Sequence, residues 1–167
     1  HEKAHGVWIA SLVYPLFENA LRGHYGHTIA EHQKAMGELF EPFSTVAERT
    51  PGAWFPTARS ADEIATPTSS NRYVGWPYTK FMNAMNQVNQ SAFVLLCSVA
   101  RAKAMGIDPS KWVYLHGCAD TTERWYMSDR TNYFSSKAIR VLGEQALGMA
   151  GKSIEEKKRR TTDRLPT

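Results

Sequence analysis

The first five residues carry two histidines and a glutamate at a spacing that zinc hydrolases use. His1 and His5 flank Glu2 in the order H-E-x-x-H. On an α-helix, residues four apart share a face, so both imidazoles would bind zinc and the carboxylate would act as general base. No helix pattern precedes the motif, and Gly6 follows it at once. A zinc hydrolase through His1, Glu2 and His5 is therefore the least favoured function here, and we assign no metal ligand.

The two cysteines lack the surroundings that activate a thiol. Cys97 lies within an apolar run, and Cys118 follows His116 by two residues. A nucleophilic thiolate needs a cation, a helix N-terminus or an imidazole nearby, whereas free cysteines more often pack as small buried hydrophobes. We expect structural roles for both. Three further histidines fit no common metal site and are expected at the surface: His24, His27 and His32.

Basic residues concentrate near the C-terminal end of the sequence. Residues 152–167 carry three of the four net positive charges, so the remainder is nearly neutral. The run Lys-Lys-Arg-Arg at 157–160 could hold phosphate electrostatically. Because no aromatic residue accompanies it, we expect residues 152–167 to be a solvated, disordered tail, and we expect no nucleic-acid partner.

The composition is that of an ordinary globular chain. It has 167 residues, of which 43% are hydrophobic and 22% charged, which argues against wholesale disorder. No apolar run approaches the roughly 20 residues of a membrane span. Two cysteines cannot form a disulfide framework, so a reducing, cytoplasmic location is expected. The sequence begins at His1, so we also expect a piece of a longer protein.

Local signals predict helices in the first half of the chain. Residues 15–22 follow a helical apolar pattern that glycines end. Capping boxes at 28–31 and 60–63 begin two more helices. We expect Pro42 to bend or end the first of these two. Residues 50–80 interleave large aromatic side chains with Pro, Ser and Thr, which indicates an ordered, packed loop.

The second half alternates strand and helix signals. Residues 92–98 form an apolar run of strand length, typical of a strand buried on both faces. A helix over 99–105, a second strand over 112–116 and a helix over 136–150 are predicted to follow. This order indicates an α/β fold.

Several short blocks, in order, resemble one family. They are Tyr-Pro-Leu-Phe-Glu-Asn-Ala-Leu-Arg at 14–22, Ile-Ala-Glu-His at 29–32, Ala-Trp-Phe-Pro at 53–56, Glu-Ile-Ala-Thr-Pro at 63–67, Pro-Tyr-Thr-Lys-Phe-Met-Asn at 77–83, Val-Asn-Gln-Ser-Ala at 88–92 and Ala-Arg-Ala-Lys-Ala-Met-Gly at 100–106. Together they resemble thiolase-like acetyl-CoA acetyltransferases, in particular the branch related to sterol-carrier-protein thiolases. The resemblance runs over residues 14–151, as an internal fragment of such an enzyme.

The resemblance implies a partial thiolase-like α/β fold. Residues 1–106 would be the end of the N-terminal half, including a helical and aromatic loop region at about 14–80. Residues 107–151 would begin the C-terminal half, and residues 152–167 depart from the family pattern. The full-length parent would be a homodimer.

The resemblance also implies transfer of acyl groups from coenzyme A thioesters in lipid metabolism. The family's nucleophilic cysteine and its partners would lie outside this chain, so we assign no catalytic residue. The family loop that lies against the pantetheine arm matches residues 83–87, although Asn86 stands where a small hydroxyl residue is common. Asn83 and Asn86 are therefore candidate coenzyme A contacts, and Lys80 is a candidate phosphate contact by its charge.

Acyl-CoA is the expected partner as a substrate, and no further cofactor is expected. The alternative function is a non-catalytic acyl-CoA-binding or interaction protein. Instead of contacting coenzyme A, the Asn and Gln side chains near residue 86 could have a structural role and order the loop by hydrogen bonds.

Overall fold

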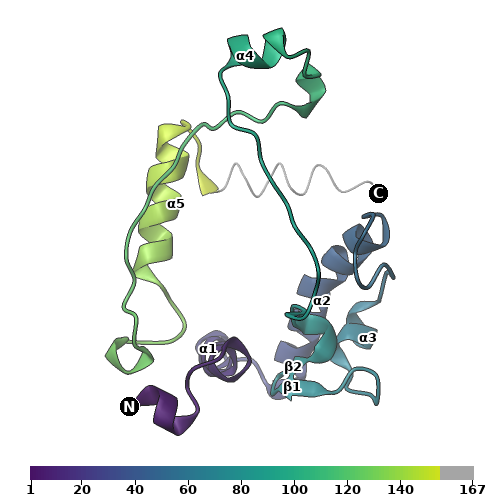
Figure 1. Ribbon diagram of the computed structural model, residues 1–167. Helices are drawn as coiled ribbons and strands as arrows, with labels where there is room; N and C mark the ends of the chain where they lie inside the picture. The colour runs from purple at the N-terminus through teal and green to yellow at the C-terminus, as the bar shows by residue number, and fades with distance from the viewer. Residues whose placement is uncertain (155–167) are drawn as a thin grey trace. The chain divides into compact units, whose positions relative to one another are not determined.

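The computed structural model describes residues 1–154 (Figure 1). Contacts between residues divide the chain into two compact units. Unit 1 comprises residues 1–86 and 124–135, and unit 2 comprises residues 87–123 together with the segment from 136. The elements of unit 1 are η1 (Glu2–His5), α1 (Ala10–Tyr25), α2 (Ile29–Glu48), α3 (Ala61–Ala65), β1 (Tyr73–Gly75), β2 (Tyr78–Thr79), η2 (Lys80–Met82) and η4 (Met127–Asp129). Unit 2 contains α4 (Val99–Ala104), η3 (Pro109–Lys111) and α5 (Lys137–Met149).

Helix α1 begins five residues earlier than the sequence predicted. Pro15 lies inside the helix rather than at its start. Its missing N–H costs one backbone bond, the one that the Ser11 carbonyl would otherwise accept. That carbonyl lies against β1, because a Cβ placed on Gly75 would come within 2.3 Å of it. Only glycine permits this close approach of strand and helix.

Helix α2 starts at the predicted capping box. The Thr28 hydroxyl accepts the Glu31 N–H, and the Glu31 carboxylate accepts the Thr28 N–H at 2.8 Å. The helix does not end at Pro42 but continues to Glu48. A proline removes only one of the many hydrogen bonds in so long a helix, so the helix continues past it.

The core of unit 1 lies between α2 and α3. Met36, Ile64, Ala65 and Met82 form its buried cluster. Gly37 lets the two helices approach, because a Cβ there would lie 2.4 Å from the Ala61 carbonyl oxygen. Figure 1 shows α3 beside α2 and close to the β1–β2 hairpin.

A buried asparagine completes this core. Asn71 is 1% exposed, and its amide N–H groups donate to the carbonyls of Glu63, Ile64 and Thr66 at 3.0–3.1 Å. These carbonyls end the short helix α3 and lack partners within it. The Asn71 side-chain oxygen accepts the Phe81 N–H at 2.9 Å, which ties α3 to η2.

Unit 2 holds the predicted helices but neither predicted strand. Helices α4 and α5 lie where the sequence predicted them, and Ser98 and Ser136 cap them. Residues 92–98 and 112–116 have no regular secondary structure, and within residues 1–154 the only strand pair is β1–β2. A strand buried on both faces needs hydrogen-bonded neighbours, and the described residues supply none. Phe93 and Val113 are accordingly 95% exposed.

The two predicted strands of the α/β layout are therefore absent from the described residues. These residues are helix-rich, with one antiparallel pair of short strands. The predicted halves, residues 1–106 and 107–151, stay a prediction. Most of the predicted tail, from residue 155 onward, lies outside the described residues.

Candidate functional site

Two of the three predicted coenzyme A contacts share one pocket of unit 1. The pocket has a volume of about 180 Å³. Lys80 and Asn83 line it together with Arg59, which sequence analysis missed. Its remaining lining residues come mainly from α2 and the 55–57 loop: Phe40, Phe43, Ser44, Ala47, Phe55, Thr57, Ile64 and Phe81. Asn86 is exposed and does not line this pocket.

Two cations stand over aromatic rings in this pocket. The Lys80 ammonium lies 5.6 Å from the Phe55 ring centre, and the Arg59 guanidinium lies 4.1 Å from the Phe81 ring centre. Such cation–π contacts orient the side chains without neutralising their charge. Within residues 1–154, no carboxylate forms an ion pair with either cation. The pocket therefore suits an anionic group such as a phosphate.

The Asn83 side chain makes one hydrogen bond within the protein and keeps its oxygen available as an acceptor. Its amide N–H donates to the Thr79 carbonyl at 2.7 Å, which fixes the chain at the end of η2. Among the described residues its side-chain oxygen has no partner, so it can accept a hydrogen bond from a ligand. The structural and the ligand-binding interpretations of Asn83 are thus compatible.

A partly buried polar cluster joins α1, α2 and β2. The Glu18 carboxylate accepts hydrogen bonds from the Tyr78 hydroxyl and from His32 Nε2, the latter at 2.7 Å. Burial, together with this bond to Glu18, raises the pKa of the Tyr78 hydroxyl above its ordinary value. His32 Nδ1 lies 3.2 Å from His27 Nδ1. Because these groups are bonded to one another, the cluster holds three elements together.

The prediction that His24, His27 and His32 all lie at the surface is wrong. His32 is buried in the cluster, and only His24 among the three is exposed, with its ring stacked on Phe134. The two cysteines also differ from expectation. Cys97 and Cys118 are both exposed, and the strand predicted to bury Cys97 does not form.

The zinc motif lacks the geometry that a metal site needs. Residues Glu2–His5 form a 3₁₀-helix, in which each residue turns by about 120°. His1 and His5 therefore do not share a face, and the Glu2 carboxylate instead accepts the Ser128 N–H at 2.7 Å. Within residues 1–154, no group of three or more His, Cys, Asp or Glu side chains is placed to hold a metal ion.

Comparison with known proteins places the chain beside a solved thiolase-like structure. No protein-family model matches the sequence, and a search of the curated proteins finds no match. Among solved structures, the chain is similar to a thiolase-like protein across nearly its whole length. That protein is a monomeric SCP2-thiolase like protein type 1 from Mycobacterium smegmatis, with 40% sequence identity and a TM-score of 0.80. The match covers 92% of this chain and 34% of that one.

The chain is thus a relative of the SCP2-thiolase-like proteins and has part of a thiolase-like fold. This confirms the family resemblance that the sequence predicted. The chain spans about a third of the length of the solved structure it matches. In residues 1–154, no helix is long and apolar enough to cross a membrane.

Proposed function

We propose that this chain is part of a thiolase-like acyltransferase and contributes a region that binds acyl-CoA. The observation that carries the proposal is the 40% identity to an SCP2-thiolase-like protein over almost the whole chain. The nucleophilic cysteine would lie outside this chain, so neither Cys97 nor Cys118 has a catalytic role. The predicted homodimer stays a prediction, and the solved neighbour is described as monomeric.

The pocket around Lys80 supports this proposal by its charge and size. Its volume of about 180 Å³ is below the roughly 300–1,000 Å³ of pockets that enclose a whole drug-sized ligand. It therefore suits one segment of coenzyme A, such as a phosphate and the atoms next to it. Lys80 and Arg59 would bind phosphate oxygens, and the Asn83 side-chain oxygen would accept an N–H or O–H of the pantetheine arm. Asn86, three residues further on, would extend this contact outside the pocket.

Calorimetric titration of the chain with coenzyme A tests the proposal. Replacing Lys80 or Arg59 by Ala should each weaken binding roughly fivefold, because an exposed ionic contact contributes about 1 kcal/mol. Asn86→Ala should weaken it less. Lys34→Ala is the matched control, because this exposed lysine of α2 pairs with Glu38 and lies outside the pocket. Absence of binding at millimolar coenzyme A, or equal affinity in all variants, would refute the proposed site.

A second assay separates the enzyme fragment from the alternative, a non-catalytic acyl-CoA-binding protein. The chain alone should release no free thiol from acetyl-CoA, since it is predicted to lack the nucleophile. Release that is abolished in Cys97→Ser or Cys118→Ser would contradict this prediction. If the full-length protein also binds acyl-CoA without transferring the acyl group, the non-catalytic function is the correct one.

A further inference from the structure

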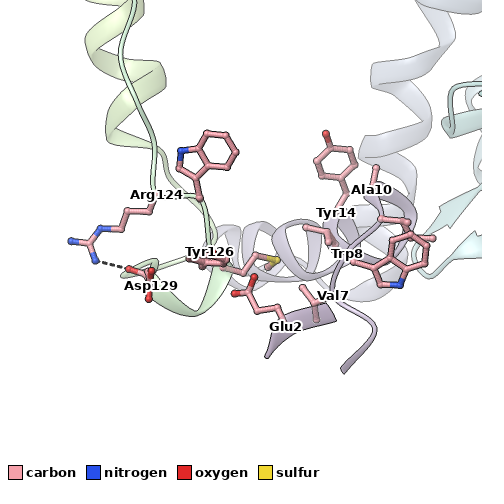
Figure 2. Close-up of a pocket in the computed structure, with 12 residues that line it drawn as sticks. Glu2, Val7, Trp8, Ala10, Tyr14, Arg124, Tyr126 and Asp129 are labelled. Atoms are coloured by element: carbon pink, nitrogen blue, oxygen red, sulfur yellow. Dashed lines mark hydrogen bonds between the residues drawn. The ribbon is translucent and has the colours of Figure 1, made fainter. Parts of the chain in front are cut away.

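Unit 1 contains a second, larger pocket, on the side of α1 where the N-terminal segment lies (Figure 2). Its volume is about 830 Å³, within the range of pockets that accept whole small molecules. One wall comes from residues 2–14 and the other from residues 124–129, and both belong to unit 1. None of the candidate coenzyme A contacts lines it.

The two walls are tethered to each other at several points. The Ser128 N–H donates to the Glu2 carboxylate at 2.7 Å, and this bond lowers the pKa of Glu2. Next to the second wall, the Tyr133 ring packs against the Phe17 ring of α1 in a T-shaped arrangement, with 5.6 Å between the ring centroids. The Arg130 guanidinium lies 5.2 Å from the same Phe17 ring. These contacts connect the two segments that line the pocket.

Four aromatic side chains dominate the lining: Trp8, Tyr14, Trp125 and Tyr126. All four are exposed, and no ring contact joins any two of them. Figure 2 shows Trp8 and Tyr14 on the N-terminal wall and Tyr126 on the other. Among the described residues, the indole N–H groups and phenol hydroxyls of these rings have no hydrogen-bond partner. The pocket thus offers flat apolar faces with unused donors beside them.

The charged side chains at the rim of the pocket bear on which ligands it can bind. Glu2 and Asp129 contribute two carboxylates, and Arg124 contributes one cation. The Arg124 guanidinium donates to the Asp129 backbone carbonyl at 2.5 Å, so part of its donor capacity is used within the rim. The Lys3 ammonium, 6.0 Å from the Trp8 ring, adds a second cation, so the charges balance and a coenzyme A phosphate would gain no net attraction there. Since the rings stand apart instead of forming a closed cage, a small cation would also find poor contact.

We propose that this pocket binds an uncharged, flat, ring-bearing molecule that carries hydrogen-bond acceptor oxygens. The rings would stack on its faces, and the indole and phenol donors would bind its carbonyl, ether or hydroxyl oxygens. This site is separate from the proposed coenzyme A pocket and does not depend on it.

Titration with Prodan, an uncharged naphthyl ketone whose fluorescence reports an apolar environment, tests this site in the full chain. The expected result is saturable binding that Trp125→Ala and Tyr14→Ala each weaken about five- to tenfold. Trp125→Phe should weaken it less, since it keeps a ring and loses only the N–H. Trp54→Ala is the matched control, because Trp54 is a similarly exposed indole outside the pocket.

Two further titrations distinguish this site from the coenzyme A pocket and from the exposed apolar side chains of unit 2. Excess coenzyme A should leave Prodan binding unchanged, so this result is independent of the proposed function. The double variant F93S/L96S removes exposed apolar side chains of unit 2 and should also leave binding unchanged. The proposal is overturned if binding is not saturable, if the Trp125 and Tyr14 variants bind like the unmodified chain, or if only the double variant loses binding.

Discussion

Replacing Gly37 by Ala tests whether the close contact of α2 and α3 determines the stability of unit 1. In an exposed helix interior, this change stabilises a protein by roughly 0.5–1 kcal/mol, because glycine loses more backbone entropy on folding. At Gly37 the added Cβ would lie 2.4 Å from the Ala61 carbonyl oxygen and 3.1 Å from the Ala65 Cβ. Real Cβ atoms essentially never approach another atom within 3.0 Å, so α3 must move.

That movement has a cost that the structure allows us to bound. Helix α3 is held by its capping box and by the Asn71 side chain, and Ile64 packs beside Met36 in the core. Shifting it is an overpacking change, which costs about 1–3 kcal/mol. After subtracting the helix-propensity gain, we expect Gly37→Ala to lower the free energy of unfolding by about 0.5–2 kcal/mol.

Urea unfolding followed by far-ultraviolet circular dichroism measures this free energy. Hydrogen exchange of the α3 amides, which should speed up, localises the effect to unit 1. Gly23→Ala in α1 is the matched control, since nothing lies within 4 Å of a Cβ there. It should be neutral or stabilising. The proposed role of the close helix contact is wrong if both variants change stability with the same sign.

Two more predictions concern the ends of α3. Asn71→Ala should destabilise unit 1 by about 2–4 kcal/mol, because it leaves the Phe81 N–H and the carbonyls of Glu63 and Thr66 without their partner. Urea unfolding measures this loss, with Asn19→Ala as the control. Hydrogen bonds from the Ser60 backbone N–H and hydroxyl lower the pKa of Glu63 below its ordinary value near 4.5. The stabilisation from this cap is therefore present above pH 4.5 and lost as the pH falls through the lowered pKa. The stability difference between the unmodified chain and Glu63→Gln should shrink on acidification, and a difference that does not change with pH would contradict the role of the carboxylate.

Sequence patterns located the features that depend on a few neighbouring residues. Both capping boxes form as predicted, because each joins a hydroxyl and a carboxylate only three residues apart. Arg59 could not be assigned to the candidate site from the sequence, since 21 positions separate it from Lys80 and only the fold brings them to one pocket. The burial of His32 could not be predicted either, because its partner Glu18 comes from another helix and Tyr78, which shares this carboxylate, comes from β2.

Residues 92–98 and 112–116 were predicted as strands and form none, for a different physical reason. A helix satisfies its backbone hydrogen bonds within one segment, so the capped helices α4 and α5 form from their own residues. A strand exchanges every backbone bond with a neighbour, and a strand apolar on both faces also needs a layer against each face. The described residues provide neither for these two segments, and the chain covers about a third of the relative it matches. Their apolar composition predicted burial, but Phe93 and Val113 are exposed, because within residues 1–154 no neighbouring strand pairs with either segment.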